Sequence, residues 1–133
     1  MKKVVSLVTI FVLCLTALAG CSGSKEVDLK TVLSDINSKY SLDLKELTDS
    51  NDLKKYYSID TEDVKQFAAE INSDSNSRVE IVLVEAVDAD AASRVNDALS
   101  KTYTSIVTQY SGYNAKKLPM VEACKVTQDG NYV

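Results

Sequence analysis

The sequence contains no histidine and no tryptophan, and it has only one proline and four glycines. Without histidine, metal sites built on imidazole and acid–base pairs that depend on it are excluded. The four glycines, at positions 20, 23, 112 and 130, are too scattered to form a loop that cradles phosphate. From these absences we expect no catalytic residue, no metal site and no cofactor.

A basic surface is also lacking, because 19 acidic residues outnumber 15 basic ones and the net charge is −4. Nucleic acid requires a positively charged face, so it is excluded as a partner. Broad electrostatic adhesion to anionic lipid is excluded for the same reason. The composition is that of a mildly acidic domain.

A long apolar run is present at the amino terminus. Lys2 and Lys3 precede an uncharged stretch, Val4–Ala19, that is rich in Leu, Val, Ile, Phe and Ala. This is the pattern of a secretory signal peptide. The run is short for a transmembrane helix, which needs roughly 20 residues. A transmembrane anchor is the alternative interpretation.

The end of this run indicates how it is processed. An aliphatic residue, two small residues and a cysteine resemble the lipobox of bacterial lipoproteins, whose cysteine receives a diacylglyceryl group and becomes the first mature residue. Two acyl chains on one residue give stable anchoring in a bilayer. A plain secretory signal followed by a chance cysteine is the alternative. We predict a cleaved signal peptide over residues 1–20, then a lipidated cysteine and short tether over residues 21–27, with the motif Leu18-Ala19-Gly20-Cys21.

The predicted mature chain keeps 113 residues, enough for one small domain over residues 28–133. Loss of the two lysines in the signal peptide takes the net charge from −4 to −6. Cys14 is lost and Cys21 is lipidated, so Cys124 has no partner for an intramolecular disulfide. We expect Cys124 to be a buried small hydrophobe in a strand, within the stretch MVEACKV.

Apolar periodicity predicts three helical segments. The first spans Leu29–Lys39 and has Asp28 as its N-cap. A short helical turn is predicted over Leu53–Tyr57. The longest helix, Ala89–Ser111, has mostly apolar residues every three or four positions, and Gly112 stands where a helix stop belongs.

Two neighbouring segments predict strands. Val79–Val87 is apolar on both faces, which suggests a central strand that is covered on both sides. Val64–Ile71 fits a helix or a strand by propensity. The short polar turn Ser73–Ser77 between the two segments favours a β-hairpin over a helix.

The segment after Pro119 reads as strand, turn and strand, with Asp129-Gly130 as the turn. Only three residues follow, so the last strand is a stub or the sequence is a truncated version of a longer one. We predict a single α+β domain in the order α-β-β-α-β-β. A mostly antiparallel sheet of about four strands carries one long helix packed across it, and an N-terminal helix adds to the cover.

The order of these segments resembles the DUF4358 family of small lipoproteins from Gram-positive, largely clostridial, bacteria. The resemblance rests on the lipoprotein signal, YYSID…EDVKQFAAEI, a short polar turn, VEIVLVEAVDADAASRVNDAL, a helix ending in Tyr110 and Tyr113, and a closing hairpin. It covers roughly Leu29–Val133, and its most specific piece is Glu80 followed by Ile81–Val84. The family has no assigned function, so the resemblance implies no catalytic residue. It also implies that relatives continue with apolar residues beyond the last position of this chain.

Two clusters of carboxylates are candidate functional groups: Asp60 with Glu62 and Asp63, and Asp88 with Asp90. A calcium loop needs more oxygen ligands and a glycine turn, so helix capping and solvated surface are the better interpretations. A hydrolase that uses two carboxylates needs a cleft that holds them at the right separation, which makes it a remote alternative.

Tyrosine is the enriched aromatic residue, with seven copies against two phenylalanines. Tyr110 and Tyr113 are three positions apart at the end of the long helix and can share a face. They are a candidate surface for binding a sugar or a partner. The competing and favoured interpretation is that tyrosines seal the rim of a small core.

The leading functional hypothesis is a non-enzymatic binding domain, lipid-anchored through Cys21 on the outer face of the cytoplasmic membrane. The bilayer is then one partner, and the other is an envelope protein or a component of the cell wall. One alternative is a small-molecule binding or sensing module with a pocket between helix and sheet. The remote alternative is the carboxylate hydrolase.

Overall fold

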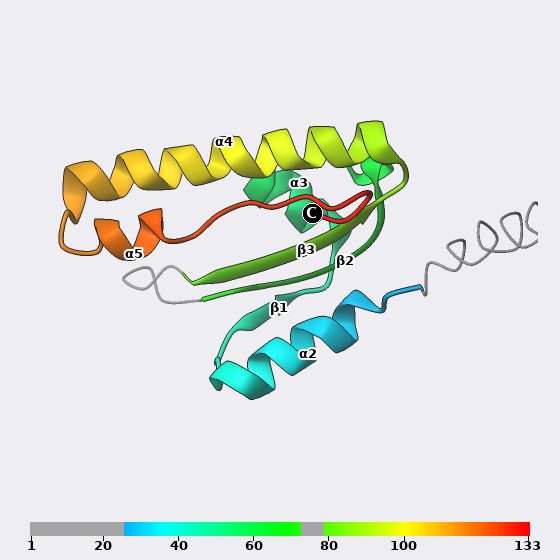
Figure 1. Cartoon of the computed structure of the whole chain (residues 1–133), viewed down its shortest axis with the longest axis horizontal. Coiled ribbons are helices and arrows are strands. Elements are labelled where there is room, and N and C mark those ends of the chain that lie inside the picture. Colours follow the sequence, from blue (N-terminus) through cyan, green and yellow to red (C-terminus); the bar gives the residue numbers. More distant parts are fainter. Residues whose placement is uncertain (1–25, 73–78) are drawn as a thin grey trace, which may run out of the picture.

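The computed structural model describes residues 26–72 and 79–133. In these ranges a three-stranded antiparallel sheet has helices on both faces (Figure 1). The predicted α+β class is confirmed, with three strands in place of about four. The predicted signal peptide, Cys21 and the turn Ser73–Ser77 lie outside the described residues.

The centre of the sheet is a hairpin of two strands, β2 (Val64–Ile71) and β3 (Glu80–Ala86), as predicted. The pairing runs from Val64 opposite Ala86 to Ile71 opposite Glu80, and the register shifts between Val64 and Gln66. Val64–Ile71, which fits a helix or a strand by propensity, is therefore a strand, because it pairs with β3. A 3-10 turn, η2 (Thr61–Asp63), leads into the hairpin.

Helix α2 (Leu29–Tyr40) covers one face of the sheet and confirms the predicted N-terminal helix. The carboxylate of Asp28 accepts a hydrogen bond from the Lys30 amide at 3.0 Å, which caps the first turn. The helix buries Leu29 and Leu33, which cluster with apolar residues of the sheet. The apolar residues that recur at helical spacing thus form the face of α2 that packs on the sheet.

A strand that the sequence did not predict, β1 (Lys45–Leu47), pairs antiparallel with the end of β2 at one edge of the sheet. Helix α3 (Ser50–Tyr57) follows and starts three residues before the predicted turn Leu53–Tyr57. It places Leu53 and Tyr57 in the core under the opposite face. The region between α2 and the hairpin is therefore more ordered than its polar sequence indicates.

Helix α4 (Ala89–Tyr113) crosses that opposite face (Figure 1). Asp88 is its N-cap and accepts a hydrogen bond from the Ala91 amide at 2.7 Å. The predicted stop at Gly112 is wrong, because the helix continues to Tyr113. Gly112 is exposed with open space around its Cα, so it lowers helix propensity there without ending the helix.

Both faces of β3 are covered, as its two-sided apolar pattern predicts. Val82 and Val84 pack in the cluster beneath α4, whereas Ile81 and Leu83 pack against the α2 cluster. The sheet is therefore the middle layer of three. Glu80 lies on the same face as Val82 by strand alternation.

The segment after Pro119 forms a helix and not the predicted strand. Helix α5 (Leu118–Glu122) has Pro119 in its first turn, where the missing amide proton is not needed. Cys124 follows this helix and is exposed, which corrects the prediction of a buried thiol in a strand. Because this segment is a helix and not a strand, the sheet pairing that would have buried the Cys124 thiol does not form.

The predicted turn at the carboxyl end is present. Gly130 has a φ of 56°, and the backbones of Asp129 and Tyr132 exchange hydrogen bonds of 2.8 and 2.9 Å. The arm after the turn pairs with β3 through an isolated bridge between Glu85 and Tyr132. Within the given sequence, the predicted last strand is therefore a short bridge, as the stub alternative describes it.

Candidate functional site

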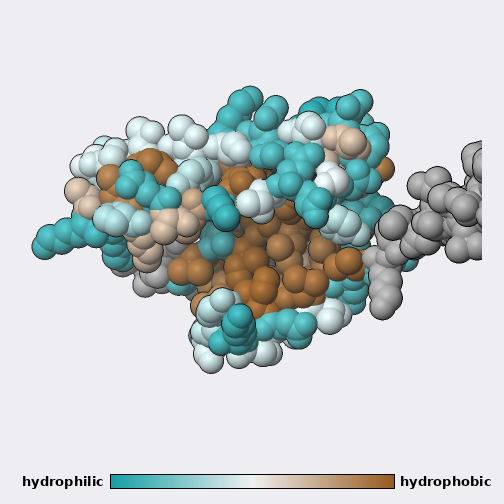
Figure 2. Space-filling view, in the orientation of Figure 1, coloured by the Kyte–Doolittle hydropathy of each residue, from teal (hydrophilic) through white to brown (hydrophobic). Residues whose placement is uncertain are grey.

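A pocket of about 360 Å³ lies between the second half of α4, α5, the carboxyl-terminal segment and β3. Helix α4 contributes Leu99, Tyr103 and Ile106, and the last segment contributes Val126 and Val133. The lining is mostly apolar. Figure 2 shows a continuous apolar area between α4 and α2 on this side of the molecule.

The pocket forms because α4 extends beyond the part of the sheet that it covers. Its 25 residues span about 37 Å. Its buried residues end at Leu99, but its apolar stripe continues through Tyr103 and Ile106 toward α5. The Tyr103 hydroxyl donates to the Val121 carbonyl at 3.2 Å, which joins the two helices. The stripe and α5 enclose a space that no strand fills within the described residues.

Polar groups in the pocket wall are few. The buried Tyr57 donates its hydroxyl proton to Oε2 of Glu80 at 3.0 Å. The Cys124 thiol lies 3.5 Å from the Met120 carbonyl oxygen. Among the described lining residues, Glu80 has the single side-chain carboxylate. The arrangement suits a ligand that is held mainly by apolar burial, with a few polar groups to orient it.

One wall of the pocket is a strand edge. Val84 and Val133 exchange two backbone hydrogen bonds of 2.9 Å, and the Ala86 amide donates to Asn131 at 2.8 Å. Alternate residues of a strand direct their backbone groups to the same side, so Val82 directs its amide and carbonyl outward like Val84. On the side of β3 that faces away from β2, no strand in the described ranges pairs with Val82.

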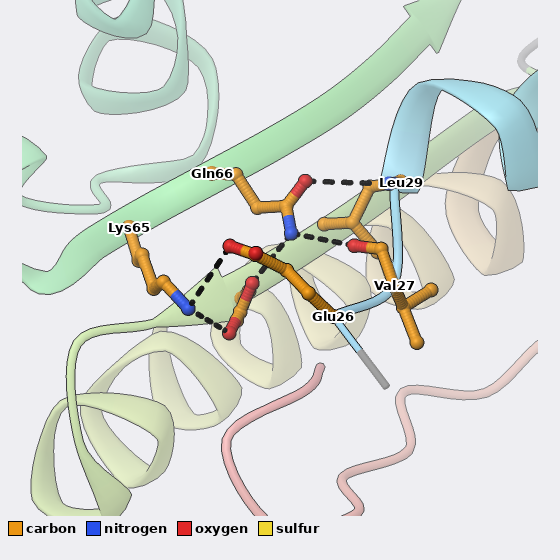
Figure 3. A network of polar contacts seen from close by, with 6 residues as sticks. Glu26, Val27, Leu29, Lys65 and Gln66 are labelled. Atoms are coloured by element: carbon orange, nitrogen blue, oxygen red, sulfur yellow. Dashed lines mark hydrogen bonds and ion pairs between the residues drawn. The ribbon is translucent and has the colours of Figure 1, made fainter. Parts of the chain in front are cut away.

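A polar network on the α2 face, which sequence reasoning missed, is centred on Gln66 (Figure 3). Its amide nitrogen donates to the Val27 carbonyl at 2.6 Å and to Oε2 of Glu85 at 2.5 Å. Its amide oxygen accepts from the Leu29 backbone at 3.3 Å. The network therefore ties the start of the domain to the middle of the sheet.

The Glu85 carboxylate is the charged centre of this network. Its side chain is 8% exposed, and Oε1 lies 2.8 Å from Nζ of Lys65. Hydrogen bonds from Gln66 and Lys65 hold the pKa of this carboxyl below its usual value. Tyr132, in the carboxyl-terminal arm Asn131–Val133, adds a further hydrogen bond to the Glu85 carboxylate. We assign the network a structural role, because it does not line the pocket.

The tyrosines singled out in the sequence lie outside the pocket lining. Tyr113 is 91% exposed, and Tyr110 is partly buried on the same helix. Their role as a binding surface stays a prediction. The tyrosines that do line the pocket are Tyr57 and Tyr103, and the signal for Tyr103 is its place in the stripe with Leu99 and Ile106.

The acidic clusters have structural partners. Asp88 caps α4, and Asp63 accepts hydrogen bonds from Arg94, which hold the pKa of Asp63 below its usual value. Asp60 lies 2.9 Å from Nζ of Lys54. Capping and surface pairing, as preferred in the sequence interpretation, account for these three carboxylates.

Neither a metal centre nor a membrane span is seen in the ranges 26–72 and 79–133. No group of three or more His, Cys, Asp or Glu side chains in these ranges could hold a metal ion. No described helix combines the length and the apolar character that crossing a bilayer requires. The pocket at the β3 edge is therefore the candidate site.

The comparisons with known proteins give one match. No curated protein and no solved structure matches the chain. The model of a family described as a domain of unknown function, DUF4358, matches residues 37–133, which is more than half of the sequence. The chain belongs to the DUF4358 family.

Proposed function

We propose that the protein is a non-enzymatic binding domain, lipid-anchored at the cell envelope, and that its partner docks in the pocket beneath α4. The observation that carries the proposal is the pocket itself. It joins an apolar lining on α4 to the outward backbone groups of Val82, and one side-chain carboxylate lies among its described lining residues. Apolar burial supplies affinity, and a few polar groups supply orientation.

The anchor in this proposal is Cys21, supported by the motif Leu18-Ala19-Gly20-Cys21 at the end of an apolar run. Five residue steps separate Cys21 from Glu26, and they reach at most about 17 Å when fully extended. The domain would therefore stay close to the outer face of the membrane. A partner would be an envelope protein or a wall component within this reach.

The anchor is tested by replacing Cys21 with Ala, with Cys124→Ala as the control for loss of a thiol. Cys21→Ala is expected to leave the protein unprocessed or to release it into the medium. Cys124→Ala is expected to fractionate with membranes like the wild type. A Cys21→Ala protein that matures and fractionates like the wild type would contradict the anchor.

The pocket is tested with two substitutions of equal exposure. Met120 lines the pocket and is 51% exposed, whereas Val87 is 50% exposed and lies outside the lining. Met120→Asp is expected to abolish specific crosslinks formed on intact cells, because it places a charge at the apolar mouth. Val87→Asp is expected to retain them. Equal crosslinking by both variants would refute docking in the pocket.

A small-molecule ligand is the second candidate, favoured by a pocket volume of about 360 Å³, within the range for ligand sites. In a thermal-shift screen against envelope metabolites, a true ligand should stabilise the wild type and Val87→Asp but not Met120→Asp. If no metabolite stabilises Val87→Asp more than Met120→Asp, the small-molecule ligand would be contradicted.

A further inference from the structure

We propose that the polar network of Lys65, Gln66 and Glu85 makes two attachments depend on each other. One is the attachment of the amino-terminal segment Glu26–Leu29 to the sheet, and the other is the attachment of the carboxyl-terminal arm Asn131–Val133 to β3. The inference goes beyond the proposed function, because it concerns how two segments far apart in the sequence influence each other and does not require a ligand.

The amino-terminal segment is held by two neighbouring side chains of β2. The Gln66 amide group donates to the Val27 carbonyl at 2.6 Å and accepts from the Leu29 backbone amide at 3.3 Å. Oε1 of Glu26 lies 3.8 Å from Nζ of Lys65. Figure 3 shows these three residues of the segment gathered around Gln66 and Lys65. The segment therefore lies against both side chains.

The arm reaches the same network from the other strand. Its backbone pairs with β3 through a hydrogen bond from the Ala86 amide to the Asn131 carbonyl at 2.8 Å. Tyr132 lies opposite Glu85 in this pairing and adds a hydrogen bond to its carboxylate. The side chain of Tyr132 also packs against the apolar cluster that contains Leu29. The arm is thus attached by its backbone and by one tyrosine.

The Glu85 carboxylate is the group that the two attachments share. Its side chain is 8% exposed, Oε1 lies 2.8 Å from Nζ of Lys65, and Oε2 accepts from Gln66 at 2.5 Å. These two donors also hold the amino-terminal segment, whereas the third donor, Tyr132, belongs to the arm. A buried carboxylate that loses a donor must turn toward water or remain short of hydrogen bonds. Either change disturbs the bonds that are left.

The sign of the dependence follows from the access of water. While the amino-terminal segment is attached, three hydrogen bonds fix the Gln66 amide group and direct its donor at Glu85. Release of the segment would free this group to rotate and would admit water to the carboxylate, which weakens the charged hydrogen bond from Tyr132. By linkage, release of the arm weakens the attachment of the segment by the same factor.

The arm also forms part of the pocket wall. Val133 lines the pocket and packs against the core beneath α4. A looser arm would therefore move this wall. In this way a change in the segment that leads toward Cys21 would reach the pocket.

The test uses the full chain in mild detergent and follows amide hydrogen exchange by NMR. Tyr132→Phe removes only a hydroxyl group of the arm. The Leu29 amide reports on the amino-terminal segment, because it donates to Gln66. Its exchange should become at least about fivefold faster relative to the amide of Val95, a buried residue of α4 that reports on global unfolding.

The matched control is Tyr103→Phe. The Tyr103 hydroxyl donates to the Val121 carbonyl and has no part in the network. This variant also loses one tyrosine hydroxyl that is bonded in the folded state. It should change the exchange of the Leu29 amide, relative to that of Val95, by less than about twofold.

The reverse experiment starts from the amino-terminal side. Gln66→Met keeps the length of the side chain and removes its amide group. The Ala86 amide reports on the arm, because it donates to Asn131, and its exchange should become at least about fivefold faster relative to Val95. When Gln66→Met is already present, Tyr132→Phe should accelerate Ala86 less than it does alone. If Gln66→Met does not fold, Tyr132→Phe still decides the question.

Two outcomes would overturn the inference. Unchanged or slower relative exchange of Leu29 in Tyr132→Phe would show that release of the arm does not loosen the amino-terminal segment. Equal acceleration of Leu29 in Tyr132→Phe and Tyr103→Phe would show a general loss of stability. Neither measurement includes a ligand, so the inference can fail while the crosslinks that depend on Met120 persist.

Discussion

Glu85 and Lys65 form an ion pair in which one partner is buried and the other is not. Oε1 of Glu85 lies 2.8 Å from Nζ of Lys65, and the exposed side-chain fractions are 8% and 51%. A carboxylate removed from water requires hydrogen bonds to its charged form, and Gln66 supplies another. These contacts favour the ionised carboxylate and lower its pKa in the folded state.

The first prediction concerns pH. Because the folded pKa of Glu85 is below its unfolded value of 4.5, its contribution is present above pH 4.5 and is lost as pH falls through the folded pKa. At pH 7, Glu85→Gln should lower the free energy of unfolding by about 1–2 kcal/mol. The gap between wild type and variant should shrink below pH 4.5, measured by urea unfolding.

The control for this experiment is Glu46→Gln. Glu46 is half exposed and lies 3.5 Å from Nζ of Lys30. An exposed pair of this kind should change the free energy of unfolding by no more than about 0.5 kcal/mol at pH 7. A Glu85→Gln deficit that stays constant from pH 7 to pH 3 would contradict the role of the charge.

A second prediction contrasts two apolar truncations. Leu53 is fully buried in the core beneath α4, whereas Tyr113 is 91% exposed at the end of that helix. Leu53→Ala should cost about 2–4 kcal/mol of unfolding free energy because it leaves a cavity. Tyr113→Ala should cost less than about 0.5 kcal/mol. If urea denaturation gives similar losses of unfolding free energy for the two variants, the burial of Leu53 beneath α4 would be contradicted.

A third prediction uses the same substitution at two glycines. Gly112 lies within α4 with open space around it, so Gly112→Ala should stabilise the protein by about 0.5–1 kcal/mol. Gly130 has a φ of 56°, so Gly130→Ala should destabilise it by about 1 kcal/mol and loosen the turn. Thermal unfolding measures both. A shift of the same sign for the two variants would contradict these backbone assignments.

A fourth prediction concerns the thiol that sequence reasoning placed in the core. Cys124 is exposed after α5 and lines the mouth of the pocket. In a chain with Cys14→Ala and Cys21→Ala, a thiol reagent should therefore modify Cys124 under native conditions. Reaction that requires denaturant would restore the buried assignment.

The sequence predicts the elements whose signals are local. The amphipathic spacing and Asp28 cap predict α2, and the stripe after Asp88 predicts α4. The hairpin of β2 and β3 follows from two apolar segments joined by a polar turn. By contrast, β1 has three residues and pairs with Ala69–Ile71, far along the chain. Its formation depends on a contact that no local pattern contains.

The site is less accessible to sequence reasoning because it depends on the relative placement of three segments. The segment after Pro119 is predicted to be a strand from its apolar residues. A proline at this position, however, also suits the first turn of a helix. Tyr110 and Tyr113 are candidates only because they are three positions apart in the sequence. Tyr103 lines the pocket because α5 returns beside it, and that return is a tertiary contact.

The hydrogen bonds of Gln66 also determine how the domain bears mechanical load. Val27 and Leu29 lie at the root of the segment that leads toward Cys21, and both bond to the Gln66 side chain. A pull applied through Glu26 would reach β2 through these two bonds before it could unwind α2 from its first turn. Tension at that end would thus be shared between α2 and the sheet.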